Sequence, residues 1–286
     1  RKTCVWFKTH RLERKLNWPT NQAHDKRKKI GESSMEIPYL DLTKQYQALS
    51  SKIEPRVQKV MASGQYVLGP EVQECEEKLA KFVGAPYCVS AASGTDALLM
   101  ALLAYDVKVG DEIIVPAFSF FATAEVVALI GAIPIFVDIE EDSFNLDPKR
   151  LKNAITPKTK GIIPVSLYGQ VPDMNEINEI ASAHNIPVME DAAQSFGATF
   201  QNKKVGSLTE ITTTSFFPAK PLGCYGDGGA IFTDNDDLAE KCKAIRIHGT
   251  TTDRYHSELI GLNGRLDSMQ AAVLLEKLTI FDEELD

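Results

Sequence analysis

The chain has 286 residues, of which 44% are hydrophobic and 24% charged, an ordinary composition for a globular protein with a sizeable core. Its formal net charge of −8 at pH 7 does not favour nucleic acid as a partner. The five cysteines are scattered and no pair has CxxC spacing, so the sequence predicts neither a disulfide framework nor a metal site. This cysteine usage fits a reducing, cytoplasmic compartment. No apolar run approaches the roughly 18 residues that a membrane span needs, so no membrane partner is expected.

The first 34 residues differ in charge from the rest of the chain. They hold ten lysines and arginines against three acidic residues, whereas the remainder is strongly acidic. We expect residues 1–34 to be a basic, disordered, non-native leader, with Met35 as the true start and residues 35–286 as the folded domain. The alternative is a basic arm that binds nucleic acid through residues 26–29.

From residue 70 onward, helical and strand patterns alternate along the chain. The pattern predicts helices at residues 71–83, 94–105, 122–130, 149–155, 173–184, 236–247 and 266–278. It predicts strands at residues 87–89, 112–115, 133–137, 161–165, 186–189, 211–217 and 230–233. Such alternation indicates an α/β domain around a mostly parallel sheet, in which ligands bind beyond the carboxyl ends of the strands.

Lys220 follows a predicted strand and precedes a run with four glycines, Gly223 to Gly229. A lysine in a sheltered turn loses its proton more easily than a solvated one, and it then acts as an amine nucleophile of the kind that forms Schiff bases. Taken alone, the position fits a solvated lysine beside a glycine-rich loop equally well.

A second segment with chemical potential is Glu190-Asp191-Ala192-Ala193-Gln194, which follows another predicted strand. Asp191 can pair with a cationic ring nitrogen, as the acid of pyridoxal phosphate (PLP) enzymes does. Gln194 can donate to the phenolic oxygen of the same cofactor. The simpler interpretations are an N-cap for Asp191 and an ordinary loop amide for Gln194.

Three further positions suit a phosphate and an aromatic ring. Gly94 and Thr95 open an apolar helix, where free backbone N–H groups attract an anion, although an ordinary helix cap explains them too. Ser215 can add a hydroxyl to the same phosphate, or it is a solvent-facing strand residue. Phe120 can stack on an aromatic ring, or it belongs to the core. Together with Asp191, Gln194 and Lys220, these residues make a complete contact set for PLP.

Several segments resemble the DegT/DnrJ/StrS-type nucleotide-sugar aminotransferases, which are PLP enzymes of the aspartate aminotransferase fold type I. The resemblance runs from about Ile37 to the end of the chain. The segments that carry it are residues 64–71, 93–98, 190–197, 215–230 and 261–267. Residues 163–170 and 216–229 bring it closer to a WbpE-like subgroup, which aminates UDP-2-acetamido-2-deoxy-3-oxo-glucuronate on the way to O-antigen sugars.

The resemblance implies a role for each of these residues. Lys220 would bind PLP covalently and move the proton, Asp191 would pair with the ring nitrogen, and Gln194 would contact the phenolic oxygen. The others would act as phosphate ligands (Gly94, Thr95, Ser215), as the stacking ring (Phe120), as a ligand of the neighbouring subunit's cofactor phosphate (Asn263) and as a contact of the sugar or donor (Arg265).

The resemblance also implies partners and a missing part. It implies a nucleotide-sugar substrate, L-glutamate as amino donor and a homodimer with shared active sites. Family members continue into a smaller C-terminal domain, so we expect this chain to be the large domain alone. The rival interpretations are a 4-oxo-sugar aminotransferase and an inactive fragment or regulatory sugar-binding protein.

Overall fold

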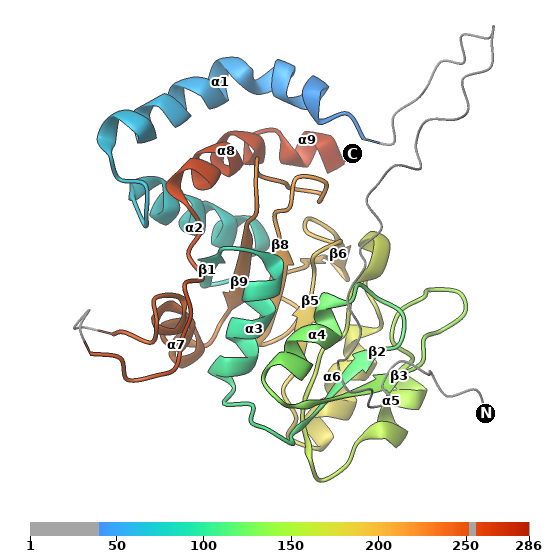
Figure 1. The fold of residues 1–286 in the computed structure, drawn as a ribbon. Coiled ribbons are helices and arrows are strands. Elements are labelled where there is room, and N and C mark those ends of the chain that lie inside the picture. The colour runs from blue at the N-terminus through green and yellow to red at the C-terminus, as the bar shows by residue number, and fades with distance from the viewer. Residues whose placement is uncertain (1–39, 252–255, 286) are drawn as a thin grey trace, which may run out of the picture. The chain divides into compact units, whose positions relative to one another are not determined.

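The computed structural model describes residues 40–251 and 256–285, and all of its elements belong to the compact unit that begins at Leu40 (Figure 1). The predicted leader, residues 1–34, and the boundary at Met35 lie outside the described residues. Within the described part of the chain, no helix is both long and apolar enough to cross a bilayer.

A central sheet of seven strands organises the domain. Three strands pair in the order β3-β2-β4, and four pair in the order β1-β9-β8-β5. Parallel bridges from Ile162 to Val188 and from Val165 to Asp191 join the two groups. Only β9 runs antiparallel to its neighbours, so the prediction of a mostly parallel α/β sheet is confirmed. The strands are β1 (Tyr87–Ala91), β2 (Glu112–Pro116), β3 (Ile133–Val137), β4 (Thr159–Ile162), β5 (Met189–Asp191), β8 (Ile211–Ser215) and β9 (Gly229–Thr233).

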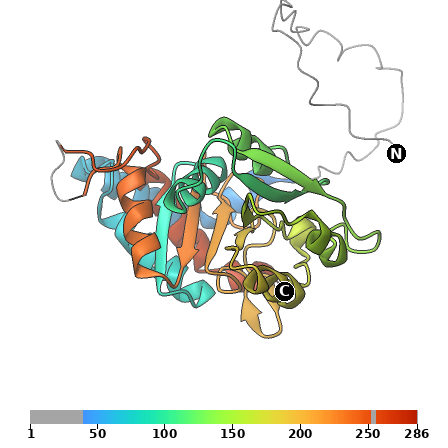
Figure 2. The same cartoon turned by 90° about the horizontal axis from the view of Figure 1, so that it is seen from below.

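Helices cover both faces of this sheet (Figure 2). The alternation of side chains along β2 shows how the faces divide, because Ile113 packs with α3, α4 and α7 whereas Ile114 packs with α5 and α6. Helices α2 and α8 pack against Phe232 of β9 on the same side as α5 and α6. The bounds are α2 (Pro70–Val83), α3 (Gly94–Ala104), α4 (Ala122–Leu129), α5 (Pro148–Ala154), α6 (Met174–Ala183), α7 (Asp236–Arg246) and α8 (Ser268–Leu278).

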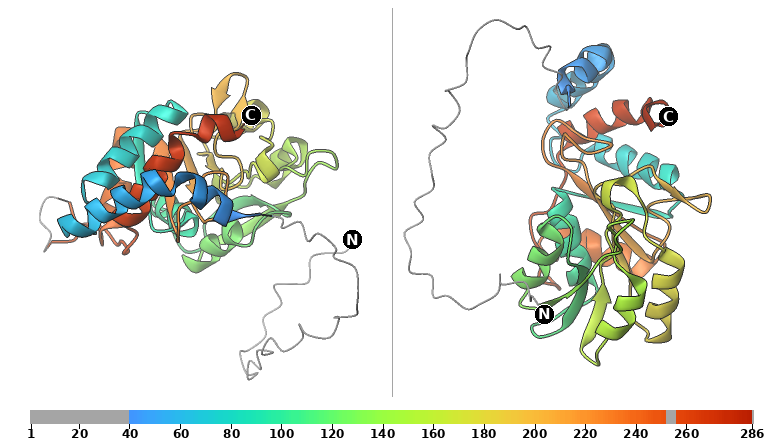
Figure 3. Two further views of the ribbon diagram at one scale, coloured as in Figure 1. Left: turned by 90° about the horizontal axis from the view of Figure 1, so that it is seen from above. Right: turned by 90° about the vertical axis from the view of Figure 1, so that its right-hand side faces the viewer.

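One long helix, α1 (Leu42–Ser63), was not predicted from the sequence. It contacts the sheet domain through α8, against which Leu49 and Ile53 pack on Val273 (Figure 3). Its apolar stripe is narrow and Pro55 lies inside it, so its periodicity is weak. The small hairpin β6 (Thr199–Phe200) and β7 (Lys203–Lys204), the 3₁₀ turn η1 (Leu167–Gly169) and the short α9 (Phe281–Leu285) are also additions to the prediction.

One strand boundary matters for the site. The strand predicted at residues 186–189 is β5, which begins at Met189 and ends at Asp191. Pro187 has no N–H for the ladder, so regular pairing starts after it. Glu190 and Asp191 are charged residues that the strand nevertheless buries, and this is why an apolar pattern ended the prediction too early.

Candidate active site

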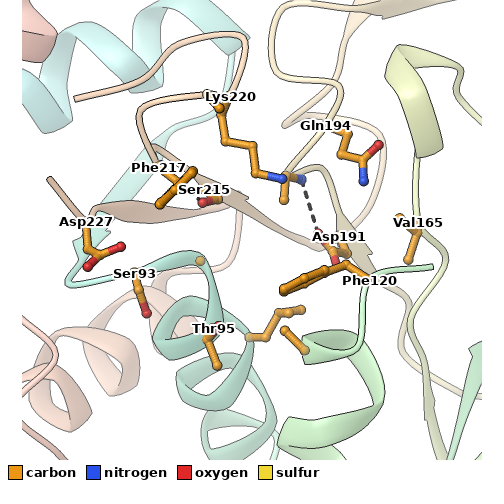
Figure 4. Close-up of a pocket in the computed structure, with 15 residues that line it drawn as sticks. Ser93, Thr95, Phe120, Val165, Asp191, Gln194, Ser215, Phe217, Lys220 and Asp227 are labelled. Atoms are coloured by element: carbon orange, nitrogen blue, oxygen red, sulfur yellow. Dashed lines mark hydrogen bonds between the residues drawn. The ribbon is translucent and has the colours of Figure 1, made fainter. Parts of the chain in front are cut away.

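A cavity of about 520 Å³ opens at the carboxyl ends of β1, β2, β4, β5 and β8 (Figure 4). This is the edge of the sheet at which the sequence predicted a ligand site. Seven of the nine predicted site residues line the cavity, namely Gly94, Thr95, Phe120, Asp191, Gln194, Ser215 and Lys220. The topology therefore brings together side chains that lie up to 126 positions apart in the sequence.

Asp191 lies at the floor of the cavity and is 5% exposed. Its Oδ2 accepts a hydrogen bond from the Thr123 hydroxyl at 2.8 Å, and its Oδ1 accepts one from the backbone N–H of Ala193 at 3.1 Å (the dashed line in Figure 4). Burial raises the pKa of this carboxyl, whereas the two hydrogen bonds and the charge of Lys220 act in the opposite direction. The Ala193 contact shows that Asp191 also supports the next turn, so the two interpretations of this residue are compatible.

Gln194 reaches the same cavity with a fixed amide orientation. Its Oε1 accepts a hydrogen bond from the backbone N–H of Tyr168 at 2.9 Å. The Nε2 group is therefore turned toward the cavity, as Figure 4 shows. A donor in that position suits an anionic oxygen of a ligand.

Lys220 belongs to the turn that follows β8 and is half-buried. Its backbone N–H donates to the carbonyl of Phe217 at 2.8 Å, which closes the turn. A Cβ atom at Gly223 would lie only 2.5 Å from the Pro218 carbonyl oxygen, so the chain can fold back this tightly only with glycine there. The side chain of Lys220 extends into the cavity on the side of Asp191 and Gln194 (Figure 4).

The opposite end of the cavity is formed by the first turn of α3. Ser93 caps this helix by accepting from the Asp96 N–H at 3.0 Å, and Gly94 and Thr95 follow as its first residues. A Cβ atom at Gly94 would lie 2.6 Å from the Cβ of Ser215, so the start of α3 and the end of β8 are in direct contact. The first backbone N–H groups of α3 and the hydroxyl of Ser215 thus lie close together where the helix dipole favours an anion.

Phe120 is 68% exposed and lies at the cavity, so it is not a core residue. Asn263 is exposed and Arg265 is half-buried, and neither is among the residues that line the cavity. The roles that the resemblance implied for these two residues therefore remain predictions.

Two residues at the site were missed by the sequence analysis. Thr123 supplies the hydrogen bond to Asp191 from the first turn of α4, and no local pattern marks it because its partner is 68 positions away. Asp227 lines the cavity beside Ser93, within the glycine-rich run that was interpreted only as a turn.

The arrangement fits PLP. The N-terminus of α3 lies at one end of the cavity, a buried carboxylate and an amide donor lie at the other, and a lysine amine enters between them (Figure 4). A phosphate, a protonated ring nitrogen, a ring oxygen and an aldehyde carbon each have a matching group in this set.

Comparison with known proteins decides the family. Residues 47–286 match the model of the DegT/DnrJ/EryC1/StrS aminotransferase family. The chain belongs to this family. Its predicted fold, its PLP cofactor and its class of reaction are thereby confirmed.

Individual relatives of this aminotransferase family give finer detail. The chain is 55% identical over 249 residues to the UDP-2-acetamido-2-deoxy-3-oxo-D-glucuronate aminotransferase of Pseudomonas aeruginosa, covering 87% of this chain and 69% of the relative. It is 48% identical over 248 residues to a pleiotropic regulatory protein of Geobacillus stearothermophilus, covering 87% of this chain and 66% of the relative. A Bacillus subtilis structure with bound cofactor PMP aligns with a TM-score of 0.82 at 36% identity, over 90% of this chain and 58% of that one. The chain thus spans about two thirds of the length of the Pseudomonas and Geobacillus relatives.

Behind the site of this aminotransferase lies a second buried carboxyl, Glu190. It is fully buried, accepts from the Ser166 hydroxyl at 2.6 Å and has a longer contact of 3.4 Å with the Thr212 hydroxyl. Burial raises the pKa of Glu190 to about 7 from an ordinary 4.5. The folded state thus binds a proton here that the unfolded state has released, and stability falls as pH rises from about 4.5 through 7.

We expect Glu190→Gln to remove this pH dependence. Because each pKa unit corresponds to about 1.4 kcal/mol, the wild-type protein should lose up to about 3 kcal/mol more stability than the variant between pH 5 and pH 8. Urea unfolding of both proteins without cofactor at the two pH values measures the difference. Glu179→Gln, at an exposed position on α6, should behave as the wild type. Parallel pH profiles for wild type and Glu190→Gln would contradict the expectation.

We expect Gly94→Ala to destabilise the protein, because the cost of the collision with Ser215 should exceed the gain in helix propensity. Alanine favours a helix by about 1 kcal/mol over glycine, but its methyl group would collide with Ser215, and overpacking of this kind typically costs about 1–3 kcal/mol. The variant should unfold at lower urea concentration and bind PLP at least about tenfold more weakly. The double variant Gly94→Ala with Ser215→Gly removes the 2.6 Å contact, leaves one of 3.2 Å to the Cα of residue 215, and should recover part of the lost stability. No recovery would show that another contact limits Gly94.

Proposed function

We propose that this chain transfers an amino group to the keto group of a nucleotide-linked sugar, with UDP-2-acetamido-2-deoxy-3-oxo-glucuronate as the favoured substrate and L-glutamate as donor. The observation that carries the proposal is the convergence of Lys220, Asp191 and Gln194 on one cavity with an anion site at its far end. The name of the Pseudomonas relative supports the choice of sugar. The predicted place in surface polysaccharide and O-antigen biosynthesis belongs to the same proposal.

The residues would divide the chemistry among themselves. PLP, when bound, supplies an electron sink for the negative charge that develops at the amino-bearing carbon. The carboxylate of Asp191 would hold the ring nitrogen in its protonated form. The Nε2 group of Gln194 would donate to the ring oxygen, and the start of α3 with Ser215 would hold the phosphate. The Lys220 amine would accept a proton from the amino-bearing carbon of the donor. In the second half-reaction it would return a proton that ends on the sugar carbon that receives the amino group.

Both substrates would use the same cavity in turn, as ping-pong kinetics require. Incubation of the purified protein with PLP, L-glutamate and the 3-oxo sugar tests this directly. Mass spectrometry should detect an amino sugar and 2-oxoglutarate in equal amounts. Product from a 4-oxo sugar in place of the 3-oxo sugar would support the rival aminotransferase.

We also propose a homodimer in which Asn263 serves the neighbouring subunit's site. Two observations support it. Asn263 is exposed and lies outside its own subunit's cavity, and apolar side chains are exposed nearby in sequence at Leu259 and Ile260. Leu259 is 41% exposed and Ile260 is 87% exposed, so two neighbouring large apolar side chains are available to an interface.

A complementation experiment tests the shared site. Lys220→Ala and Asn263→Ala homodimers should each have low activity. In a mixed dimer, one site receives an intact Lys220 from one chain and an intact Asn263 from the other. After mixing and reassembly, about a quarter of all sites should therefore be intact, with activity to match. No recovery in verified mixed dimers would contradict the shared site.

A regulatory role is the second candidate, because the Geobacillus relative carries that name. It differs from the first in its expected chemistry. A regulatory protein would bind the nucleotide sugar without producing 2-oxoglutarate.

We place the protein in the cytoplasm, a proposal supported by four free, buried cysteines, Cys75, Cys88, Cys224 and Cys242.

A further inference from the structure

The turn that follows β4 has a backbone that needs support. Tyr168 lies in the left-handed region with φ 55° and ψ 25°, and Gly169 follows with φ 85°. A non-glycine residue in this conformation costs about 1–2 kcal/mol and persists only where the surroundings hold it. The turn spans residues 166–170 and adjoins the cavity through Val165.

Asn145 ties both ends of this turn. It is 1% exposed and comes from the loop between β3 and α5. Its Oδ1 accepts from the backbone N–H of Leu167 at 3.1 Å, and its Nδ2 donates to the carbonyl of Gln170 at 2.9 Å. One buried amide thus satisfies a donor and an acceptor on either side of the left-handed residue. The loss of the Leu167 contact would leave a buried backbone N–H without this partner, whereas Gln170 is exposed and its carbonyl can bind water instead.

Ser166 anchors the beginning of the same turn. Its hydroxyl donates to Glu190, and its backbone N–H donates to the carbonyl of Asp191 at 3.2 Å. The turn is therefore attached to the strand that carries the acid of the site. The position of the Tyr168 N–H is set by these contacts together with Asn145.

The backbone N–H of Tyr168, at the centre of the turn, contacts a side chain of the site. The Tyr168 N–H donates to Oε1 of Gln194, and a donor there allows only the amide orientation that points Nε2 into the cavity (Figure 4). Without this bond the Gln194 amide could rotate by half a turn and present an oxygen to the ligand. An acceptor facing the anionic ring oxygen of a bound cofactor would be repelled.

We propose that Asn145 is a positioning residue that, through the left-handed turn and the Tyr168 N–H, holds Gln194 with its amide donor toward the bound cofactor. The inference rests on the proposed function, because it takes PLP as the ligand of the cavity. Asn145 touches neither cofactor nor substrate and acts only through the turn.

The test compares Asn145→Ala with Gln194→Ala in the PLP-loaded protein. A hydrogen bond to the ring oxygen stabilises the negative charge of that oxygen, so the bound cofactor gives up its proton at a lower pH. Loss of this hydrogen bond should raise the pH midpoint of the visible absorption band by about one unit in either variant. Because both substitutions remove the same donor, the double variant should shift the midpoint no further than Gln194→Ala alone.

Two further variants serve as controls, one at a surface asparagine and one at Asn145 itself. Asn153→Ala removes an exposed asparagine from α5, and its midpoint should match the wild type. Asn145→Ser replaces the amide with a smaller neutral polar group that cannot make both contacts, so it introduces no buried charge and should give a shift in the same direction as Asn145→Ala. Amide hydrogen exchange at Tyr168 in the protein without PLP should be faster in both Asn145 variants than in the wild type.

The outcomes distinguish the two proposals. If the wild-type protein forms no visible band with PLP, the proposed function fails and the inference fails with it. If the band shifts in Gln194→Ala but stays at the wild-type midpoint in folded Asn145 variants, the inference alone is overturned. Shifts of equal size that add in the double variant would also overturn it, because Asn145 would then act by a separate route.

Discussion

Replacement of Lys220 by alanine is expected to abolish covalent attachment of PLP and to lower the transamination rate by at least about 10⁴-fold. The expectation follows from the site, because Lys220 is the lysine that lines the cavity and its side chain extends toward Asp191 and Gln194. The variant loses the nucleophile and the proton carrier together. Borohydride reduction followed by peptide mass mapping should give an adduct on residue 220 in the wild type and none there in the variant.

Two controls separate the amine's chemistry from its charge and from general damage. Lys220→Arg keeps a positive charge beside Asp191 but cannot form the covalent link, so it should be as inactive as Lys220→Ala. Lys203→Ala, at an exposed position in the β6–β7 hairpin, should retain both adduct and rate. An adduct spread over surface lysines in the wild type would refute the assignment of Lys220.

The parts of the site that were predictable from the sequence are those with local causes. Ser93 caps α3 and Gly94 and Thr95 follow it, so a three-residue pattern was enough to predict which residues form this end of the cavity. Asp191 and Gln194 lie on one short segment after a strand, and Lys220 follows another strand. The rule that parallel strands place their carboxyl ends at one edge then brings these segments together.

The parts that escaped prediction depend on contacts between distant residues. The Thr123 bond to Asp191 and the Asn145 bonds to the turn join segments that no periodicity relates. Helix α1 escaped because its burial depends on α8, which follows more than 200 residues later. The burial of Glu190 was not predicted for a different reason. A charged residue at the end of a strand normally indicates a loop, but here the Ser166 hydroxyl donates a hydrogen bond to the buried carboxyl group.

The second large effect is expected for Asp191→Asn, which removes one negative charge and changes little else. Among the residues that line the cavity, Asp191 is the one proposed to keep the ring nitrogen protonated, and the variant lacks its charge. Loss of one preorganised electrostatic contact of this kind typically lowers kcat by about 10²–10³-fold. Stopped-flow measurement of the half-reaction with L-glutamate should show the loss, whereas Asp237→Asn, at an exposed position on α7, should not.

The same substitution should not weaken the fold. Burial raises the pKa of Asp191 in the folded protein, so its ionised form opposes folding at neutral pH. An asparagine can keep one oxygen for the Ala193 N–H, and the Thr123 hydroxyl can turn to accept from its amide. We therefore expect the variant without cofactor to be at least as resistant to urea at pH 8 as the wild type. A large fall in both stability and rate would mean that Asp191 is mainly a structural cap, whereas a fall in rate alone identifies a charge that is maintained for catalysis against the preference of the fold.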